Sequence, residues 1–562
     1  MTLHESGSDN MRRPTSAPQR FADRPRAMLD SLAKRIEFLG NGKVSLAITV
    51  AVVLVIVAAR YYYSLVTGYI VPDEAWYYDT FILDKMPVTS YREVFVAIFL
   101  VFFHGVNNVW TFLLRGVLYS SVWAVGVVVM FYVILRRLKV PEKTSSLLIL
   151  SLPLFPVFIV LLPTVLTETP GLFVGLLGVY FCLKHVQEGH AIDSLLSGVF
   201  FVLAYKIREP YLLFAVGNVI LFLVLSVKRR SLGSILGYAI PVSLVFPVPI
   251  SLEPLKFAQP LSNFIANAIS QFVLWSHQAS SVLPPAASQA PMLTPAFVVP
   301  ITMALHPDLP EAVAIGLWYG FNPLFAFFAA FSLFILCFDL FRKRSSTLLL
   351  LALNAIWSFG AFVVPAAITL QLLPSAISGW TSVIIRFTHP SLPCIVGFPS
   401  LYHLVKPRRI AALTLILLVL GSTQTGALAV AFQRSLSVEP MNRLSLDYRA
   451  PYYRMYLLAK ESGKTLVFGG LHMRGIRMYM AMLPNVVLVP VAANETEFQT
   501  LLGQDWDVIF LYDDWVTVKI PSMIDAYPPY YAEILRSKQY AGYNIETLWI
   551  DSESYALRMT NV

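Results

Sequence analysis

The feature that most constrains this chain is a series of long apolar segments. A helix of about 20 apolar residues can cross the hydrocarbon core of a bilayer. Eleven segments fit, at approximately 44–68, 111–135, 145–163, 170–184, 191–206, 211–227, 232–251, 312–340, 347–372, 388–405 and 410–432. Only 13% of the residues are charged, against about 25% in soluble domains, and the mean hydropathy is +0.65. The sequence therefore predicts a polytopic α-helical membrane protein.

Lysine and arginine gather in short clusters between these segments. Each cluster follows an even-numbered segment: Arg136, Arg137, Lys139 and Lys143; Lys228, Arg229 and Arg230; Arg342, Lys343 and Arg344; Lys406, Arg408 and Arg409. Because cytoplasmic loops carry an excess of Lys and Arg, this pattern predicts a cytosolic N-terminus and an extracytoplasmic C-terminus. We expect a multi-pass protein of the plasma (inner) membrane. The clusters also explain the net charge of +9, so no nucleic-acid partner is expected.

The chain divides into three parts. Residues 1–43 mix Ser, Pro and Arg without apolar periodicity, and a disordered cytosolic tail is expected there. Residues 44–432 form the membrane domain, with a first external loop at 69–110 and a long external loop at 252–311 that is rich in Pro, Ser and Ala. Loops of such length are typically lids or disordered segments. Residues 433–562 are more charged and are expected to form an extracytoplasmic domain.

In this last part, strand-like runs alternate with helix-like segments. The runs are Thr465–Phe468, Val486–Val491 and Val508–Leu511, and a hairpin is expected around Glu546–Met559. This alternation predicts a small α/β domain with a partly parallel sheet.

Three carboxylates lie among aromatic residues directly after the first apolar segment, in the run Pro72–Asp79. Acidic residues at a membrane boundary are costly and usually face a cavity where they serve function. Asp73 and Glu74 also suit the start of a short helix, where the dipole favours acids, although a cap needs only one of them. The neighbouring Trp76 and Tyr77 are read as part of an interfacial aromatic belt.

Other charged residues near segment ends fall on the same predicted face as this acidic turn. The complete set is Asp73 and Glu74; Glu168; Lys206, Arg208 and Glu209; Arg386 and His389. Arg60 lies late in the first segment, and His104 lies in 91–108, which fits an interfacial helix because polar residues interrupt it. The alternatives are that acids begin helices, that basic side chains snorkel to headgroups, and that Arg208 pairs with Glu209.

Acidic and basic groups collected at one face suit the transfer of a group from a lipid-linked phosphate to a hydroxyl. A carboxylate can accept the hydroxyl proton as the new bond forms, which contributes about 10²- to 10⁴-fold. Arg and Lys can bind the phosphate and stabilise the charge that grows on the leaving oxygen. These residue types therefore favour an enzyme.

Four motifs carry a family resemblance. They are Val71–Tyr77 in the first external loop, Thr167–Pro170 as a second acidic loop, the charged segment Arg208–Pro210, and the late stretch Arg386–Pro390. In this order they resemble the GT-C glycosyltransferases that use polyprenyl-phosphate sugars, in particular the protein O-mannosyltransferase and aminoarabinose transferase branch. The resemblance covers about 44–432. No repeat suggestive of the β-trefoil insert of eukaryotic protein mannosyltransferases is seen, and this departure argues against protein as the acceptor.

The resemblance implies a GT-C fold and an integral-membrane glycosyltransferase, either a hexosyl- or a pentosyltransferase. Such an enzyme takes a sugar from an undecaprenyl- or dolichyl-phosphate carrier to a hydroxyl of a glycan, lipid or protein acceptor on the extracytoplasmic face. The resemblance makes Asp73 the general base, with Glu74 and Glu168 orienting the acceptor or the sugar. The expected substrate-binding residues are Lys206, Arg208, Glu209, Arg386, His389, His104 and Arg60.

Two other classes of function stay open at this point. A transporter or flippase of a lipid-linked substrate also places charges in an apolar bundle, but transporters usually show internal repeats and midplane binding residues. A noncatalytic subunit with a partner-binding external domain is the second alternative. No cofactor is certain: Asp73, Glu74 and Glu168 offer the oxygen ligands that a divalent cation prefers, without a recognisable ligand spacing.

Overall fold

The computed structural model describes residues 41–70, 72–84, 93–154, 162–208, 211–230, 232–245, 346–347, 349–354, 356, 449–469, 475–490, 494–513, 528–537, 539–550 and 555–561. Nearly all of the predicted tail and the whole of the loop at 252–311 lie outside these residues. The same holds for the predicted segments at 312–340, 388–405 and 410–432.

The first apolar segment forms helix α2 (Gly42–Thr67), and both of its ends are capped. At the start, the Asn41 side chain accepts hydrogen bonds from the backbone N–H groups of Lys43 and Val44, at 3.0 and 3.4 Å. At the end, Gly68 has a φ of 71° and donates its N–H to a carbonyl of the last turn. Glycine is common at this position because it adopts the left-handed conformation without steric cost. These caps fix the point where the acidic turn begins.

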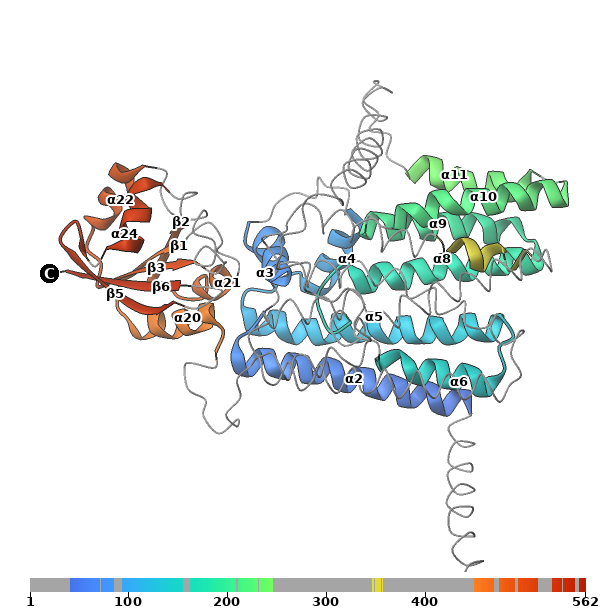
Figure 1. The fold of residues 1–562 in the computed structure, drawn as a ribbon, viewed down its shortest axis with the longest axis horizontal. Helices are drawn as coiled ribbons and strands as arrows, with labels where there is room; N and C mark the ends of the chain where they lie inside the picture. Colours follow the sequence, from blue (N-terminus) through green and yellow to red (C-terminus); the bar gives the residue numbers. More distant parts are fainter. Residues whose placement is uncertain are drawn as a thin grey trace, which may run out of the picture.

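Six further described helices form a bundle with α2 (Figure 1). They are α5 (Val109–Arg137), α6 (Glu142–Ser151), α8 (Glu168–Glu188), α9 (Ala191–Ile207), α10 (Leu212–Arg229) and α11 (Gly233–Val245). In this bundle α5 and α6 lie next to α2, and α10 and α11 lie on the far side (Figure 1). Most begin and end close to the predicted segments. The predicted segment 145–163 differs: α6 ends at Ser151 and a single 3₁₀ turn follows. Pro153 explains the end of α6, because proline lacks the N–H that an α-helix requires.

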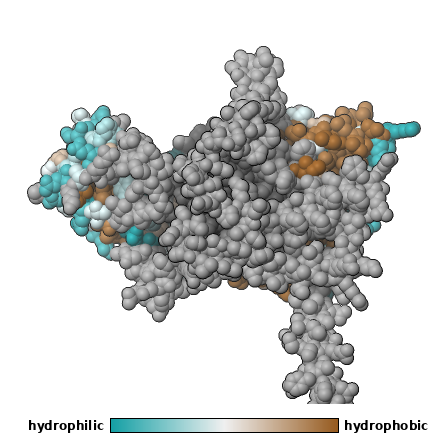
Figure 2. Space-filling view, viewed as in Figure 1, coloured by the Kyte–Doolittle hydropathy of each residue, from teal (hydrophilic) through white to brown (hydrophobic). Residues whose placement is uncertain are grey.

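Within the described ranges, α2, α5 and α8 are long and apolar enough to cross a membrane. Hydrophobic side chains also gather on the surface over α10 and α11 (Figure 2). The exposed side chains there include Val216, Ile220, Leu223, Val227, Leu236 and Ile240. Large exposed apolar surfaces mark contact with lipid or protein. Together with the mean hydropathy of +0.65, these features identify an integral membrane protein.

The bundle has two chemically different ends. At one end, Arg137 of α5 forms an ion pair with Glu188 of α8, and Arg229 of α10 donates to the carbonyls of His185 and Val186 on α8. The first two predicted basic clusters therefore lie at this end. The acidic turn, the start of α8 and the end of α9 lie at the other end. Which end faces the cytosol stays a prediction.

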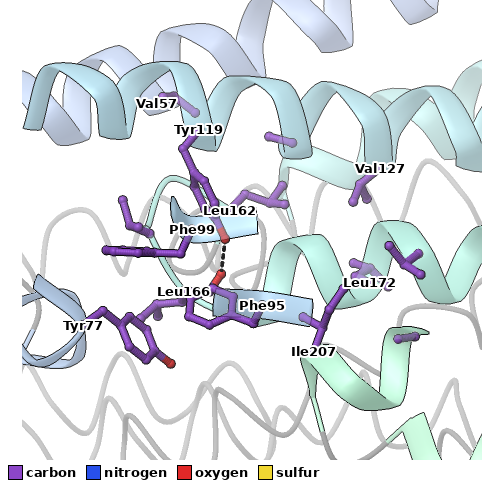
Figure 3. Packing of buried hydrophobic residues seen from close by; sticks show 14 of the residues in the cluster. Val57, Tyr77, Phe95, Phe99, Tyr119, Val127, Leu162, Leu166, Leu172 and Ile207 are labelled. Atoms are coloured by element: carbon purple, nitrogen blue, oxygen red, sulfur yellow. Dashed lines mark hydrogen bonds between the residues drawn. The ribbon is translucent and has the colours of Figure 1, made fainter. Parts of the chain in front are cut away.

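The acidic turn is a short helix, α3 (Pro72–Tyr78), continued by one π-helical turn at Asp79–Leu83. Helix α4 (Glu93–Phe103) follows and buries one face against it. The rings of Tyr77 and Phe95 lie 4.8 Å apart between their centroids, and both lie in the buried cluster of Figure 3. Aromatic packing therefore holds the acidic turn against the end of the bundle.

The C-terminal part contains a six-stranded sheet with the strand order β2-β1-β3-β6-β5-β4. Strands β1, β2 and β3 are parallel, and the remaining pairs are antiparallel. The three predicted strand runs coincide with β1 to β3, and the expected hairpin is β5 and β6. In chain order the elements are α20 (Pro451–Glu461), β1 (Thr465–Gly469), α21 (Ile476–Met480), β2 (Val486–Pro490), α22 (Glu495–Leu502), β3 (Val508–Asp513), α24 (Pro529–Arg536), β4 (Gln539–Tyr540), β5 (Tyr543–Ile550) and β6 (Tyr555–Asn561).

The two faces of this sheet belong to different cores. On β1, Leu466 and Phe468 are buried in a core shared with α22 and α24. Val467, on the opposite face, belongs to the same continuous cluster of buried side chains as the membrane bundle. Helices α20 and α21 on this side of the sheet contact the membrane domain near α3 (Figure 1). This contact puts the sheet and the acidic turn at the same end of the bundle.

Candidate functional site

Glu74 lies in the acidic turn with its side chain fully buried. Its Oε2 is 3.0 Å from the guanidinium of Arg60 on α2, and its Oε1 accepts a 2.7 Å hydrogen bond from the backbone N–H of Val165. The Arg60 guanidinium also lies over the rings of Tyr61 and Tyr69, whose faces attract a cation. The structure therefore joins two predicted site residues, Arg60 and Glu74, in one buried ion pair.

Glu168 lies in the first turn of α8 and forms a second buried ion pair. Its Oε1 is 3.1 Å from Nη2 of Arg208, and the two side chains are only 1% and 6% exposed. The Thr167 hydroxyl donates to the other oxygen of Glu168 and accepts a hydrogen bond from Arg208. The positive end of the α8 dipole further favours the carboxylate. Arg208 therefore pairs with an acid from a different helix.

Both ion pairs are attached to one short stretch of chain, 162–167, which precedes α8. The first pair binds the backbone N–H of Val165, and the second binds the side-chain hydroxyl of Thr167. Between these points, the Leu166 carbonyl accepts a 2.9 Å hydrogen bond from the buried hydroxyl of Tyr119 on α5 (Figure 3). The two pairs thus belong to a single network, which we call the charged network.

Two predicted site residues carry charges that these ion pairs do not use. Asp73 lies in the first turn of α3 and is partly exposed, a position that also agrees with the helix-cap alternative. Lys206 lies in the last turn of α9 and is 5% exposed. No described residue forms a hydrogen bond or ion pair with its ammonium group. A buried charge without a partner is costly, so Lys206 is suited to bind an anion.

Of the other predicted residues, the structure describes His104, whose side chain forms no hydrogen bond or ion pair with a described residue of the charged network. The side chain of His104 is exposed, and it is the His104 carbonyl that accepts a 2.6 Å hydrogen bond from Arg115. Glu209, Arg386 and His389 lie outside the described residues.

The carboxylates do not converge on a cation site in the described part of the chain. No group of three His, Cys, Asp or Glu side chains there is arranged to hold a metal ion. Glu74 and Glu168 each have an arginine as the counter-ion.

Some members of this region are absent from the predicted site. Tyr119 holds the stretch 162–167, and the Tyr61 hydroxyl lies 3.0 Å from the Ser120 hydroxyl, which joins α2 to α5. The available signal is the pair Tyr119 and Ser120 inside an otherwise apolar segment, because buried hydroxyls require hydrogen-bond partners. These two residues could have been recognised from the sequence, but their hydrogen-bond partners could not.

No protein-family model matches the chain, and no curated protein matches it. Among solved structures, the chain is similar to ArnT from Cupriavidus metallidurans bound to undecaprenyl phosphate, with 13% identity and a TM-score of 0.43, over 91% of this chain and 97% of that chain. It is also similar to the archaeal oligosaccharyltransferase AglB from Archaeoglobus fulgidus in complex with an inhibitory peptide and a dolichol-phosphate. That similarity has 11% identity and a TM-score of 0.43, over 93% of this chain and 74% of that chain. Scores this low do not establish a shared function.

Proposed function

We propose that this protein is a glycosyltransferase of the GT-C type that works within the membrane. It transfers a hexose or a pentose from a polyprenyl-phosphate carrier to a hydroxyl of a glycan, lipid or protein acceptor. The reaction takes place at the extracytoplasmic face, which is the end of the bundle that carries the acidic turn and the sheet. The eleven-segment topology expected from the sequence is part of this proposal.

The observation that carries the proposal is the distribution of charge at this end of the bundle. Two arginines are neutralised by Glu74 and Glu168. The buried Lys206 has no described counter-ion, and Asp73 keeps a partly exposed carboxylate. A carrier phosphate supplies the negative charge that Lys206 lacks, and the interaction is strong in an apolar environment. The site thus offers one group for the donor and another for the acceptor.

The proposed reaction is a single displacement at the anomeric carbon of the sugar. The acceptor oxygen forms the new glycosidic bond while the bond between the anomeric carbon and the carrier phosphate oxygen breaks. The phosphate leaves with that electron pair as polyprenyl phosphate, and the hydroxyl proton passes to Asp73. Attack opposite the leaving group inverts the anomeric centre.

The remaining residues support these two groups. Arg208 and Arg386 act with Lys206 on the phosphate, while Glu74 and Glu168 orient the substrates through the stretch 162–167. The other predicted binding residues are, in chain order, Arg60, His104, Glu209 and His389.

The position of the charges favours an enzyme over a transporter. Asp73, Glu168 and Lys206 each lie in the first or last turn of a helix. Transporter sites lie near the bilayer midplane, often where a helix is interrupted. Charges at helix ends instead suit a reaction at the membrane surface, where the acceptor can approach.

A panel of radiolabelled polyprenyl-phosphate sugars tests the proposal with the purified protein. We expect labelled product together with free carrier phosphate. Asp73→Asn should lower kcat by about 10²- to 10⁴-fold, because proton transfer is lost. Lys206→Met should raise the KM for the carrier sugar.

The matched control is Glu188→Gln, which removes a carboxylate at the opposite end of the bundle and should leave turnover unchanged. Absence of transfer from every carrier sugar rejects the enzyme, and undiminished turnover by Asp73→Asn rejects Asp73 as the base.

A further inference from the structure

The acidic turn is attached to the C-terminal part of the chain at both of its ends. The attached segment runs from Gly68, directly after α2, to Asp84, directly after the π-helical turn. The C-terminal residues that hold it come from α20, α21 and the residue before α20. These two regions are far apart in sequence, by 393 residues in the case of Asp84 and Arg477.

At the start of the segment, hydrogen bonds fix the backbone. The Thr67 carbonyl accepts from the backbone N–H of Ala450 at 2.9 Å, and the Gly68 carbonyl accepts from the Tyr479 hydroxyl at 2.8 Å. The Tyr452 hydroxyl accepts from the N–H of Ile70 at 2.5 Å and donates to its carbonyl at 3.0 Å. One phenol thus satisfies both polar backbone groups of Ile70.

The same tyrosines are locked by aromatic packing. The Tyr479 ring centroid lies 5.8 Å from that of Tyr452 and 5.2 Å from that of Tyr453. Trp110, in the first turn of α5, meets Tyr479 edge to face at 5.9 Å. Edge-to-face pairs of this kind contribute about 0.5–1.5 kcal/mol each beyond burial. The hydrogen-bonding hydroxyls are therefore held on a rigid base that includes the membrane domain.

At the far end of the segment, an ion pair makes the attachment. Nη1 of Arg477 lies 2.9 Å from Oδ2 of Asp84, and its Nη2 binds Oδ1 of the same carboxylate. A planar guanidinium bound through two parallel hydrogen bonds fixes orientation as well as distance. Arg477 lies in α21, the same short helix that provides Tyr479.

Between these attachments lie the residues of the proposed chemistry. Ile70 and Asp84 enclose Asp73 and Glu74, and Glu74 is fixed in addition to Arg60. The segment is therefore held at three places, two of them by the C-terminal part. A segment held in this way cannot rotate or translate without breaking one attachment.

We infer that the C-terminal part sets the position of the Asp73 carboxylate, with Tyr452, Arg477 and Tyr479 as positioning residues for the transfer reaction. The inference rests on the proposed role of Asp73 as the base. These residues do not touch the substrate; they act by holding the turn. A displacement of about 1 Å at a reacting group costs about 10²-fold in rate, so loosening one attachment should be visible in kcat before the fold is lost.

The test uses Arg477→Gln in the full-length protein with the active carrier sugar. We expect kcat to fall by about 10- to 10²-fold. The KM for the carrier sugar should stay within about twofold, because the interaction removed is not a contact to the donor. The exchanged pair Arg477→Glu/Asp84→Arg should recover most of the lost kcat. Tyr452→Phe, which removes only the hydroxyl, should act in the same direction as Arg477→Gln.

The matched control is Arg137→Gln, because the Arg137–Glu188 pair has a similar exposure but lies at the opposite end of the bundle. Its kcat should equal that of the wild type. Hydrogen exchange of residues 68–84 is measured in parallel without substrate and should be faster in Arg477→Gln and Tyr452→Phe but not in Arg137→Gln.

The outcomes separate the two proposals. A wild-type protein that transfers no sugar overturns the proposed function and this inference with it. An active wild type whose kcat is unchanged in Arg477→Gln and Tyr452→Phe overturns the inference alone. Unchanged hydrogen exchange of residues 68–84 in Arg477→Gln also overturns it, because loss of a contact that holds the turn must loosen the turn.

Discussion

At the scale of residues, the charges at the acidic end of the bundle differ in what holds them. Glu74 and Glu168 are buried with an arginine at 3.0 and 3.1 Å, so the cost of burial is offset by a partner of opposite charge. Asp73 is partly exposed and Lys206 has no described counter-ion. In the proposed function, the two glutamates hold the site together, and Asp73 and Lys206 act on the substrates.

The ion pair of Glu74 gives a prediction at this scale. Glu74→Gln keeps an oxygen for the Val165 N–H but removes the charge that compensates Arg60. Breaking a buried pair from one side costs about 3–5 kcal/mol, so we expect a clear fall in the Tm measured in detergent. The double variant Arg60→Met/Glu74→Gln should recover part of it, because no unpaired guanidinium remains.

The exposed ion pair at the opposite end is the control for this prediction. Glu188→Gln removes a partner of Arg137 whose side chains are 34% and 26% exposed, and such surface pairs contribute at most about 1 kcal/mol. Its Tm should stay close to that of the wild type. Equal shifts in Glu74→Gln and Glu188→Gln would show that the burial of Glu74 carries no energetic weight.

At the scale of elements, local properties could be predicted and pairings could not. Length and apolarity are local properties, so α2, α5 and α8 to α11 lie near the predicted bounds. The alternation of strand-like runs with helix-like segments likewise predicted the positions of β1 to β3. The stretch 145–163 is predicted as one segment although Pro153 ends the helix. The pairing of Arg208 with Glu168 depends on how each helix is rotated about its axis. The local sequence of a helix does not predict its rotation relative to a neighbouring helix.

The junction between α2 and the acidic turn gives a prediction at this scale. A Cβ added at Gly68 would overlap the side chain of Tyr453, and the φ of 71° is unfavourable for any other residue. Gly105 has a φ of 72°, but nothing lies within 4 Å of the place that its Cβ would occupy. Gly105→Ala therefore measures backbone strain alone, about 1–2 kcal/mol, whereas Gly68→Ala must also displace the Tyr453 ring.

We accordingly expect a larger fall in Tm for Gly68→Ala than for Gly105→Ala, with faster hydrogen exchange at residues 68–70. The same Tm for both variants would mean that the Tyr453 ring moves aside at no cost, which its packing against Tyr456 and Tyr479 argues against.

At the scale of the whole molecule, the membrane domain and the sheet share one continuous core. The sequence indicates that both parts lie on the same side of the membrane, because the acidic turn and the C-terminus follow odd-numbered segments. It does not indicate that they touch. The contact depends on Tyr452 and Tyr479 and on the ion pair between Asp84 and Arg477, which lie 393 residues apart. The local sequence around these residues does not indicate that they are in contact.

The Asp84–Arg477 pair makes the attachment between these parts sensitive to acid. The Arg477 guanidinium holds the pKa of Asp84 below its usual range, and the neighbouring acids Asp84 and Asp79 raise the pKa of Arg477, which stays charged throughout. A lowered folded-state pKa means that the pair stabilises fully above the ordinary Asp range, near pH 4. The stabilisation is lost as the pH falls through the lowered value.

Asp84→Asn reproduces the neutral form at every pH, so the difference in Tm between the wild type and this variant isolates the pair. We expect the wild type to be slightly more stable at pH 7, by at most about 1 kcal/mol because the pair is exposed, and equally so at pH 5. The difference should shrink only below about pH 4. Arg477→Gln should show the same loss at neutral pH, because either variant removes the same contact. A Tm difference that persists unchanged to pH 2, or one that first appears on acidification, would contradict the ion pair as the source of this stabilisation.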